Sequence, residues 1–234
     1  LFGTGIRGSL DSAMCALIEQ MNALQGYKIA CDIPSGLNNV GMPSPVAFRA
    51  NETCTMGALK TALYADAAKD YTGSIHVCNL GLPRRCYEGE TDTFLLSSED
   101  MKLPHRSVQN THKMSYGHGL FFCGEKTGAC VLAASAALHF GIGAVTVFGE
   151  PIPAAPFDFM YTSELPDTFS AAMVGSGLGR TPNIQTQALD FLSHEQVRKG
   201  QLILDADILH NAKLPTLLPL FKTPILTPHP KEFQ

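Results

Sequence analysis

Short apolar runs that end abruptly in polar or glycine-rich turns recur along this sequence, and they constrain its fold more than any other feature. In the first half, residues 27–31 lead into the turn at 32–36, which reads Asp-Ile-Pro-Ser-Gly. In the second half, apolar runs end in the turns at 175–180, 205–207 and 227–230. Such runs, separated by helical patterns, indicate parallel strands in an α/β protein. The turns would then lie at the carboxyl edge of a sheet, where open α/β sheets bind ligands.

The composition is that of a well-packed protein without a specialised partner surface. Of the 234 residues, 45% are hydrophobic and 16% are charged, which is typical of an ordered, buried chain. The net charge is −4 without a basic stripe, so nucleic acid is not expected as a partner. No apolar stretch approaches the ~18 residues of a membrane span, and the first residues lack a signal-peptide pattern. We therefore expect a cytoplasmic protein that binds neither nucleic acid nor membranes.

The cysteines and histidines do not follow the spacings of metal sites or disulfide frameworks. The seven cysteines are odd in number, include no CxxC pair and lie mostly in apolar or strand-like runs. The eight histidines are scattered, without the spacing of a zinc site. We expect reduced, buried thiols and no zinc.

The spacing of apolar residues predicts two consecutive α/β series. The first has a helix from Ser9 or Asp11 to about Leu24, strands at 28–31, 52–56 and 74–80, and a helix at 58–67. The second has strands at 119–123, 144–148, 171–174, 201–204 and 223–226, and an alanine-rich helix at 129–140. Residues 88–111 are polar and are expected to form a linker. The predicted fold class is α/β, with mainly parallel sheets in two domains.

A glycine-rich turn near the start of the chain is a candidate ligand site. It consists of Gly3, Thr4, Gly5, Ile6, Arg7, Gly8 and Ser9. Glycines permit positive φ and close backbone approach, N–H groups at a helix start bind phosphate, and Arg7 would add a cation. The same pattern also occurs in ordinary tight turns between a strand and a helix.

Asp32 and Ser35 form a second candidate site at the end of the strand predicted at 28–31. A carboxylate there fits three roles: proton transfer, a hydrogen bond to a ribose hydroxyl, or a cap on a turn stiffened by Pro34. The oxygens around Ser35 suit a hard monovalent cation. Lys60, after the next strand, is predicted to be a solvent-exposed lysine.

Three turns in the second half are expected to converge on one sheet edge. The turn at 175–180 has three glycines within five residues, which suits backbone contact with a ligand. Asp205 and Asp207 alternate along a strand direction and are candidates to bind a hydroxyl or a metal-bound water. His229 stands between two prolines, which fits a ligand contact or a structural turn. Residues 112–118, with two histidines and a lysine, fit a phosphate contact or an exposed loop.

The order of these motifs resembles that of one enzyme family. Along the chain come GTGIRG, DIPSG, TMGALK, a strand near Val77, HKMSYGH, GSGLG, DAD and TPHPKEF. This order is similar to that of the bifunctional NAD(P)H-hydrate repair enzymes. These join a Rossmann-like NAD(P)H-hydrate epimerase domain to an ADP- or ATP-dependent NAD(P)H-hydrate dehydratase domain of ribokinase-like fold. The resemblance implies that residues 1–98 are the C-terminal part of the epimerase domain and residues 99–234 the N-terminal part of the dehydratase domain.

The resemblance implies roles for residues of the epimerase part. The turn from Gly3 to Ser9 would bind the hydrated nicotinamide nucleotide. Asp32 would also bind it, and would transfer the proton that interconverts the C6 epimers. Ser35 would ligate K⁺.

The resemblance also implies a chemistry for the dehydratase part. Ala129, Gly177 and His229 would contact the substrate, and Asp205 would lie near the nucleotide. The reaction would phosphorylate the C6 hydroxyl of the S epimer and then eliminate phosphate, because hydroxide is a poor leaving group. Mg²⁺ bound with ADP or ATP would offset the phosphate charge.

Some departures from the family pattern affect the ligand detail. The family's Asn-Asn-Gly-Gly-Asp-Gly loop and a second potassium-ligating acid would precede Leu1, and its Lys-Gly loop and Gly-Thr-Gly-Asp run would follow Gln234. We therefore expect an internal piece of a longer protein. Asn79 stands where the family usually has an aspartate, and Asn38 and His210 are smaller departures.

Two other functions fit parts of the pattern. A small-molecule kinase of the ribokinase superfamily would explain the second half but gives the DIPSG segment no role. A non-catalytic module that binds nicotinamide nucleotides or a protein partner would fit the departures. The family resemblance further implies a homo-oligomer.

Overall fold

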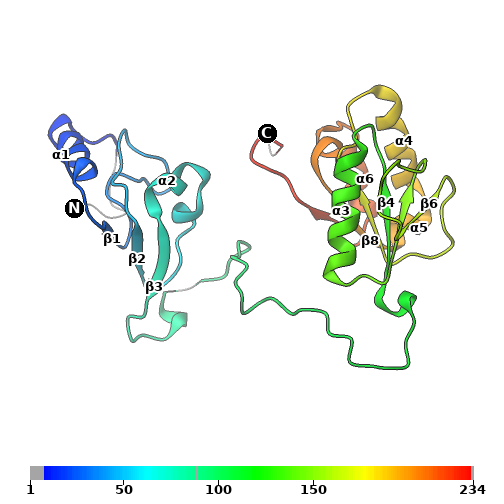
Figure 1. The fold of residues 1–234 in the computed structure, drawn as a ribbon. Helices are drawn as coiled ribbons and strands as arrows, with labels where there is room; N and C mark the ends of the chain where they lie inside the picture. Colours follow the sequence, from blue (N-terminus) through cyan, green and yellow to red (C-terminus); the bar gives the residue numbers. More distant parts are fainter. Residues whose placement is uncertain (1–7, 88, 233–234) are drawn as a thin grey trace. The chain divides into compact units, whose positions relative to one another are not determined.

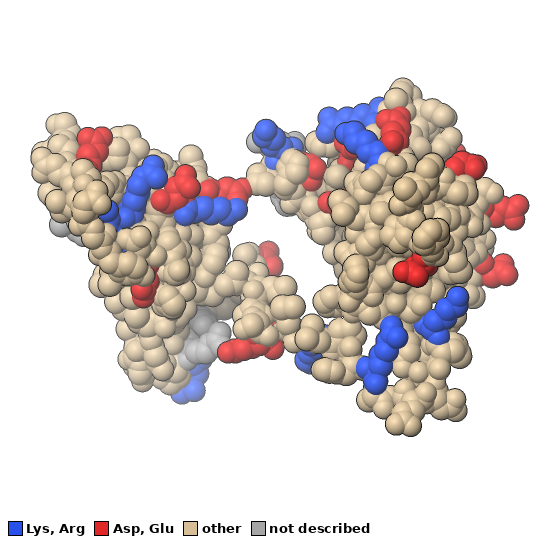
Figure 2. Space-filling view, viewed as in Figure 1, with Lys and Arg blue, Asp and Glu red and all other residues tan. Residues whose placement is uncertain are grey.

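The computed structural model describes residues 8–87 and 89–232. The chain divides into two compact units, Leu1–Leu96 and Ser97–Gln234, and each builds its own sheet (Figure 1). Within the described residues 89–112, no helix or strand forms, although the polar segment has a turn at 98–100. The face shown in Figure 2 carries both basic and acidic side chains on each unit.

The first unit is a three-stranded parallel sheet with strand order β1-β2-β3. The strands are β1 (Ile29–Cys31), β2 (Glu52–Met56) and β3 (Ser74–Cys78), and α1 (Ser12–Ala23) precedes them. The helix begins where it does because Asp11 caps it: the Met14 N–H donates to Asp11 Oδ1 at 2.8 Å. Ile18 on α1 is fully buried against Ala30 and Phe48, which fixes the helix on the sheet.

The cap gives a prediction for local stability. Asp11→Ala is expected to destabilise α1 by about 0.5–2 kcal/mol, because the Met14 N–H loses its partner. Amide hydrogen exchange in α1 measures this, with Glu19→Gln on the exposed surface of the same helix as the matched control. Equal exchange in Asp11→Ala and the control would show that the cap contributes nothing.

The predicted helix at 58–67 is wrong. The structure instead forms the 3₁₀ turns η1 (Thr61–Tyr64) and η2 (Asp66–Ala68), followed by the short helix α2 (Lys69–Thr72). Ala65 is extended, with φ −61° and ψ 145°, and interrupts any continuous helix. Both turns still bury apolar side chains, Leu63 and Ala68, in one cluster. Leu63 lies within the predicted range and is buried, but Leu59 in that range is exposed and Ala68 lies outside it, so the apolar spacing predicted neither the backbone conformation nor the full set of buried side chains.

The second unit is a six-stranded sheet with strand order β6-β5-β4-β7-β8-β9, and each neighbouring pair is parallel. Its strands are β4 (His118–Phe122), β5 (Ala144–Phe148), β6 (Phe159–Thr162), β7 (Ala171–Val174), β8 (Gln201–Leu204) and β9 (Ile225–Leu226). The predicted α/β class with parallel sheets is confirmed. Because the strands are parallel, their carboxyl ends lie at one edge.

Helices cover both faces of this sheet. Along β4, Leu120 and Phe122 enter one buried cluster, whereas Phe121 enters another, because successive side chains point to opposite faces. Figure 1 shows α3 (Thr127–Phe140) and α4 (Pro182–Ser193) on either side of the strands, and they supply Ala134 and Leu192 to these clusters. Burial on both faces explains why the central strands β4 and β5 are buried almost throughout, whereas β7 and β8 alternate between buried and less buried residues.

Several elements of the second unit were not predicted. These are η4 (Lys113–Tyr116), β6, α4, α5 (Glu195–Lys199), η5 (Ala206–His210), α6 (Leu214–Leu217) and η6 (Leu218–Leu220), while η3 (Arg84–Cys86) was missed in the first unit. A usable signal for α4 was present, since Pro182 stands at its first position, where a missing N–H costs nothing. Edge strand β6 is a run of only four residues in which Phe159 alone is buried.

Two findings concern what the described residues lack. None of their helices combines the length and apolarity that crossing a bilayer would require. They also contain no group of three or more His, Cys, Asp and Glu side chains that could hold a metal ion. The seven cysteines are free thiols, but only Cys130 is buried, so the expectation of buried thiols is wrong for the other six.

Candidate active sites

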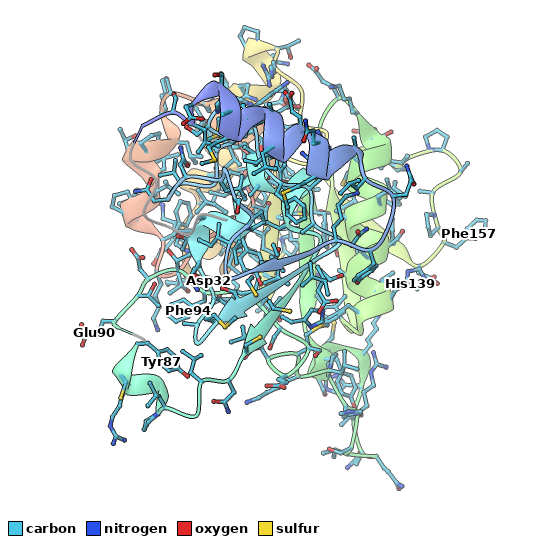
Figure 3. The ribbon with its side chains drawn as sticks, turned by 90° about the vertical axis from the view of Figure 1, so that its left-hand side faces the viewer. Asp32, Tyr87, Glu90, Phe94, His139 and Phe157 are labelled. Atoms are coloured by element: carbon cyan, nitrogen blue, oxygen red, sulfur yellow. The ribbon has the colours of Figure 1, made fainter. Side chains whose placement is uncertain are left out.

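The first candidate site is the turn that follows β1. Asp32 adopts the left-handed conformation, with φ 71°, and its N–H donates to the Cys54 carbonyl at 2.8 Å. Gly36 also has positive φ, and a Cβ there would lie 2.1 Å from the Val46 carbonyl oxygen. Ile33 between them is buried. The turn therefore holds a fixed shape that presents the Asp32 carboxylate at the end of the strand (Figure 3).

Lys60 is not the solvent-exposed lysine that the sequence predicted. Its ammonium lies 2.7 Å from Asp32 Oδ1, and its side chain is only 27% exposed. The same carboxylate oxygen accepts hydrogen bonds from the Met56 N–H at 2.9 Å and from the Thr55 hydroxyl at 3.4 Å. The presence of Lys60 in the TMGALK motif was the only sequence signal for this pair.

These contacts keep Asp32 ionised. Partial burial of the carboxylate acts to raise its pKa, but the hydrogen bonds from Lys60 and the Met56 N–H and the charge of Lys60 outweigh it, so the pKa lies below its ordinary value. A depressed pKa stabilises the fold above the ordinary value, and that contribution is lost as the pH falls through the folded-state value. Near neutral pH the group is a carboxylate, able to accept a proton.

The other predicted residues of the first site are only partly described. Gly3, Thr4, Gly5, Ile6 and Arg7 lie outside the described residues, while Gly8, with φ 87°, and Ser9 are both exposed. Ser35 is buried, and its carbonyl accepts a hydrogen bond from the Phe48 N–H at 2.8 Å. Asn79, one of the departures from the family pattern, accepts a hydrogen bond from the Gly81 N–H in the turn after β3.

The second candidate site lies at the carboxyl edge of the six-stranded sheet. Asp205, directly after β8, accepts hydrogen bonds on both oxygens: from the Ser176 hydroxyl at 2.7 Å and from the Thr227 hydroxyl at 2.8 Å. Ser176 follows β7 and Thr227 follows β9. Asp205 thus joins the turns after three neighbouring strands.

Asp207 fixes the shape of the glycine-rich turn. Its carboxylate accepts hydrogen bonds from the Gly179 N–H and from Arg180 Nε, both at 3.0 Å. Partial burial acts to raise the Asp207 pKa, but these hydrogen bonds, with the charges of Lys126 and Arg180, lower it. The carboxylate therefore stays charged while it orients the turn.

Gly177 lies against the segment that enters α3. Its carbonyl accepts a hydrogen bond from the Lys126 N–H at 2.8 Å, and its φ is 67°. A Cβ at this position would lie 2.2 Å from the Lys126 carbonyl oxygen and 2.9 Å from the Ala129 Cβ. The structure therefore places Gly177 and Ala129, two of the predicted substrate contacts, next to each other, and only glycine fits there.

The two histidine-containing motifs lie in different surroundings. His229 makes local contacts: its Nδ1 accepts from the Lys231 N–H at 3.1 Å and its Nε2 lies 3.0 Å from Glu232 Oε1. In Figure 1 the segment after β9 runs away from the sheet. His118, by contrast, is buried at the amino end of β4, with Nε2 2.7 Å from the Thr146 hydroxyl. His118 lies at the amino ends of the strands, whereas Asp205 lies at their carboxyl ends. His118 is therefore a buried structural residue and not part of the candidate site.

Comparison with known proteins relates both units to one group of enzymes. Residues 120–234 match the family described as NAD(P)H-hydrate dehydratase, and residues 1–62 match the family described as YjeF-related protein N-terminus. The bifunctional NAD(P)H-hydrate repair enzyme Nnr of Helicobacter pylori is 37% identical over 237 residues, which cover 100% of this chain and 48% of that protein. The enzyme of the same name from Coxiella burnetii is 33% identical, covering 99% of this chain and 50% of that protein.

Similar solved structures include the ADP/ATP-dependent NAD(P)H-hydrate dehydratase from Bacillus subtilis, co-crystallized with ATP/Mg²⁺, with a TM-score of 0.42 and 28% sequence identity. The match covers 56% of this chain and 50% of that one.

The two sheets define an α/β protein with a separate polar edge in each unit. The chain is a homologue of about half the length of the bifunctional NAD(P)H-hydrate repair enzymes, with a part that matches the YjeF-related family followed by a part that matches the NAD(P)H-hydrate dehydratase family. The predicted family resemblance is therefore confirmed. The chain spans about half the length of the curated relatives it matches.

Proposed function

We propose that the protein carrying this chain repairs hydrated NADH and NADPH. Residues 1–98 contribute to an epimerase that interconverts the C6 epimers, and residues 99–234 contribute to a dehydratase of ribokinase-like fold that restores the S epimer to NAD(P)H with ADP or ATP. The observation that carries the proposal is the similarity to bifunctional repair enzymes over the whole chain, with both family matches in this order. Each unit also holds an ionised carboxylate at a sheet edge.

In the epimerase part, Asp32 is the residue proposed to exchange a proton with the substrate. Like any aspartate whose pKa lies below neutral pH, it is a carboxylate at the start of the cycle, and the turn with its left-handed backbone holds it in place. The glycine-rich turn from Gly3 to Ser9 is proposed to bind the nucleotide. The donor set near Ser35 fits K⁺, because the buried hydroxyl and neighbouring carbonyls are hard oxygen donors. K⁺ would supply fixed positive charge there.

In the dehydratase part, Gly177 and Ala129 are proposed to form a wall against the substrate. Asp205 is proposed to organise the nucleotide side of the site through its bonds to Ser176 and Thr227. His229 is proposed to reach the substrate from the segment after β9. Mg²⁺ is proposed to arrive with the nucleotide and to be held mainly by its phosphates, with carboxylate oxygen at this edge as the protein ligand, and it would offset the phosphate charge.

Two further properties are proposed on narrower support. Free thiols at all seven cysteines favour a reducing, cytoplasmic location. The resemblance to the family favours a homo-oligomer.

The direct test uses the full-length protein with separately purified epimers of hydrated NADH. With ATP or ADP, Mg²⁺ and K⁺, we expect both epimers to become NADH, whereas without nucleotide the R epimer should only equilibrate with the S epimer. Formation of NADH is followed by its absorbance, and the epimers are separated by chromatography. A phosphorylated product that accumulates would instead indicate a small-molecule kinase, and binding without turnover would indicate a non-catalytic module.

A further inference from the structure

The Lys60 side chain has every one of its hydrogen-bond donors occupied. An ammonium group has three N–H bonds. Lys60 Nζ donates to Asp32 Oδ1 at 2.7 Å, to the Thr55 hydroxyl at 2.8 Å and to the Met56 carbonyl at 3.2 Å. Thr55 is itself fully buried, so this end of the lysine is held by a rigid part of β2. The ammonium therefore has no free proton directed at a ligand.

The contacts to the Asp32 carboxylate fall on one oxygen. Lys60 Nζ, the Met56 N–H and the Thr55 hydroxyl all donate to Oδ1. Among the residues that the structure describes, none donates to Oδ2, and the side chain is 33% exposed. Within the described residues, the two oxygens of this carboxylate therefore differ: Oδ1 accepts three hydrogen bonds, whereas Oδ2 accepts none.

We propose that Lys60 is a positioning residue that anchors Asp32 Oδ1 through its charge and its hydrogen bond, and that Oδ2 is the oxygen that exchanges the proton with the hydrated nicotinamide. This inference rests on the proposed epimerase function. Oδ2 takes the proton of the C6 hydroxyl while the bond between C6 and the ring nitrogen breaks and its electrons move onto that nitrogen, leaving an aldehyde at C6. When the nitrogen adds back to the other face of the aldehyde, Oδ2 returns the proton to the oxygen, so Asp32 ends the cycle as a carboxylate. Lys60 acts on the substrate only through Asp32, because its three hydrogen bonds go to Asp32, Thr55 and Met56.

The geometry of these contacts explains why a lysine suits the role of holding Asp32 Oδ1 in place. Asp32 sits in a left-handed backbone conformation that aims its side chain toward the end of β2, where Met56 and Lys60 follow. A charge-assisted hydrogen bond is stronger than a neutral one and resists rotation of the carboxylate. Fixing one oxygen leaves the other with a single orientation, which is what proton transfer to a bound substrate requires.

Two variants of the full-length protein separate positioning from proton transfer. In Lys60→Ala, we expect the kcat of epimerisation to fall about 10²-fold with a smaller change in KM, and the acidic limb of the pH–rate profile to move to higher pH. Lys60→Arg, which keeps the charge, should recover part of the lost rate, and ethylammonium added to Lys60→Ala should do the same. Lys69→Ala, at an exposed lysine paired with Asp66 in the same unit, is the matched control and should leave all three properties unchanged.

A second measurement tests the anchor independently of turnover. Carbon-13 NMR titration of Asp32 should show that its pKa rises in Lys60→Ala, even if the substrate is not the one proposed. An unchanged Asp32 pKa, or an acidic limb that does not move, would overturn the positioning role. Loss of epimerisation in Lys60→Ala with activity retained in Asp32→Asn would make Lys60 the proton-transfer residue and would also overturn it. If the protein has no epimerase activity but the Asp32 pKa still rises in Lys60→Ala, the positioning role of Lys60 is supported and the proposed function is contradicted.

Discussion

Asp32→Asn in the full-length protein should lower the rate of epimerisation by about 10²- to 10⁴-fold. The amide has almost the shape of the carboxylate and can still accept a hydrogen bond from Lys60 or the Met56 N–H, but it cannot take up a proton at neutral pH. Epimerisation is measured without nucleotide, as conversion of the R epimer of hydrated NADH to the S epimer above the uncatalysed rate. Nucleotide-dependent conversion of the S epimer should be unchanged.

The matched control for this variant is Asp70→Asn, at an exposed carboxylate on α2 of the same unit. It removes the same charge and should leave both activities as they are. In the wild-type protein, epimerisation should also decline as acid protonates Asp32, with a midpoint below the ordinary aspartate value because the folded-state pKa is depressed. Full activity in Asp32→Asn would rule out Asp32 as the residue that exchanges the proton.

Gly177→Val should abolish most of the dehydratase activity while leaving epimerisation intact. A Cβ at this position would lie 2.2 Å from the Lys126 carbonyl oxygen, and φ is 67°, so the turn must move away from the entry to α3. Backbone strain of this kind costs about 1–3 kcal/mol, and a shift of about 1 Å in a ligand-contacting segment reduces rates by about 10²-fold. The assay is the formation of NADH from the S epimer with ATP and Mg²⁺.

Gly128→Ala provides the control for Gly177→Val. Gly128 lies in the first turn of α3, and a Cβ there has no atom within 4 Å, so this change should leave the dehydratase rate unchanged. Thermal unfolding distinguishes a displaced turn from a collapsed unit. Wild-type dehydratase activity in Gly177→Val would show that the turn does not contact the substrate.

The strands of this protein could be predicted from the sequence because their short β-prone runs are bounded by turn residues. Residues 52–56, 144–148, 171–174 and 201–204 are strands with the predicted bounds. Residues 144–148 form an almost continuously buried run, whereas residues 52–56 alternate between buried threonines and less buried residues, and parallel pairing then places the following turns at one edge. The bonds from Ser176 and Thr227 to Asp205 follow from that topology.

The features that the sequence did not reveal depend on contacts between distant residues or on local backbone detail. Lys60 was predicted to be exposed because its pairing with Asp32 requires β1 and β2 to be neighbours, and no local pattern encodes that contact. The helix expected at 58–67 is absent because Ala65 is extended, which the apolar spacing does not register. The roles of Asp32, Ser35, Gly177 and His229 toward ligands stay predictions.

The most direct test of two independent sites mixes the Asp32→Asn and Gly177→Val proteins. With ATP, Mg²⁺ and K⁺, the first alone should convert only the S epimer to NADH, and the second alone should form almost no NADH from either epimer. Together they should convert both epimers completely, because the S epimer made by one protein diffuses to the other. A mixture that leaves the R epimer unconverted would contradict the account, as would an Asp32→Asn protein unable to use the S epimer.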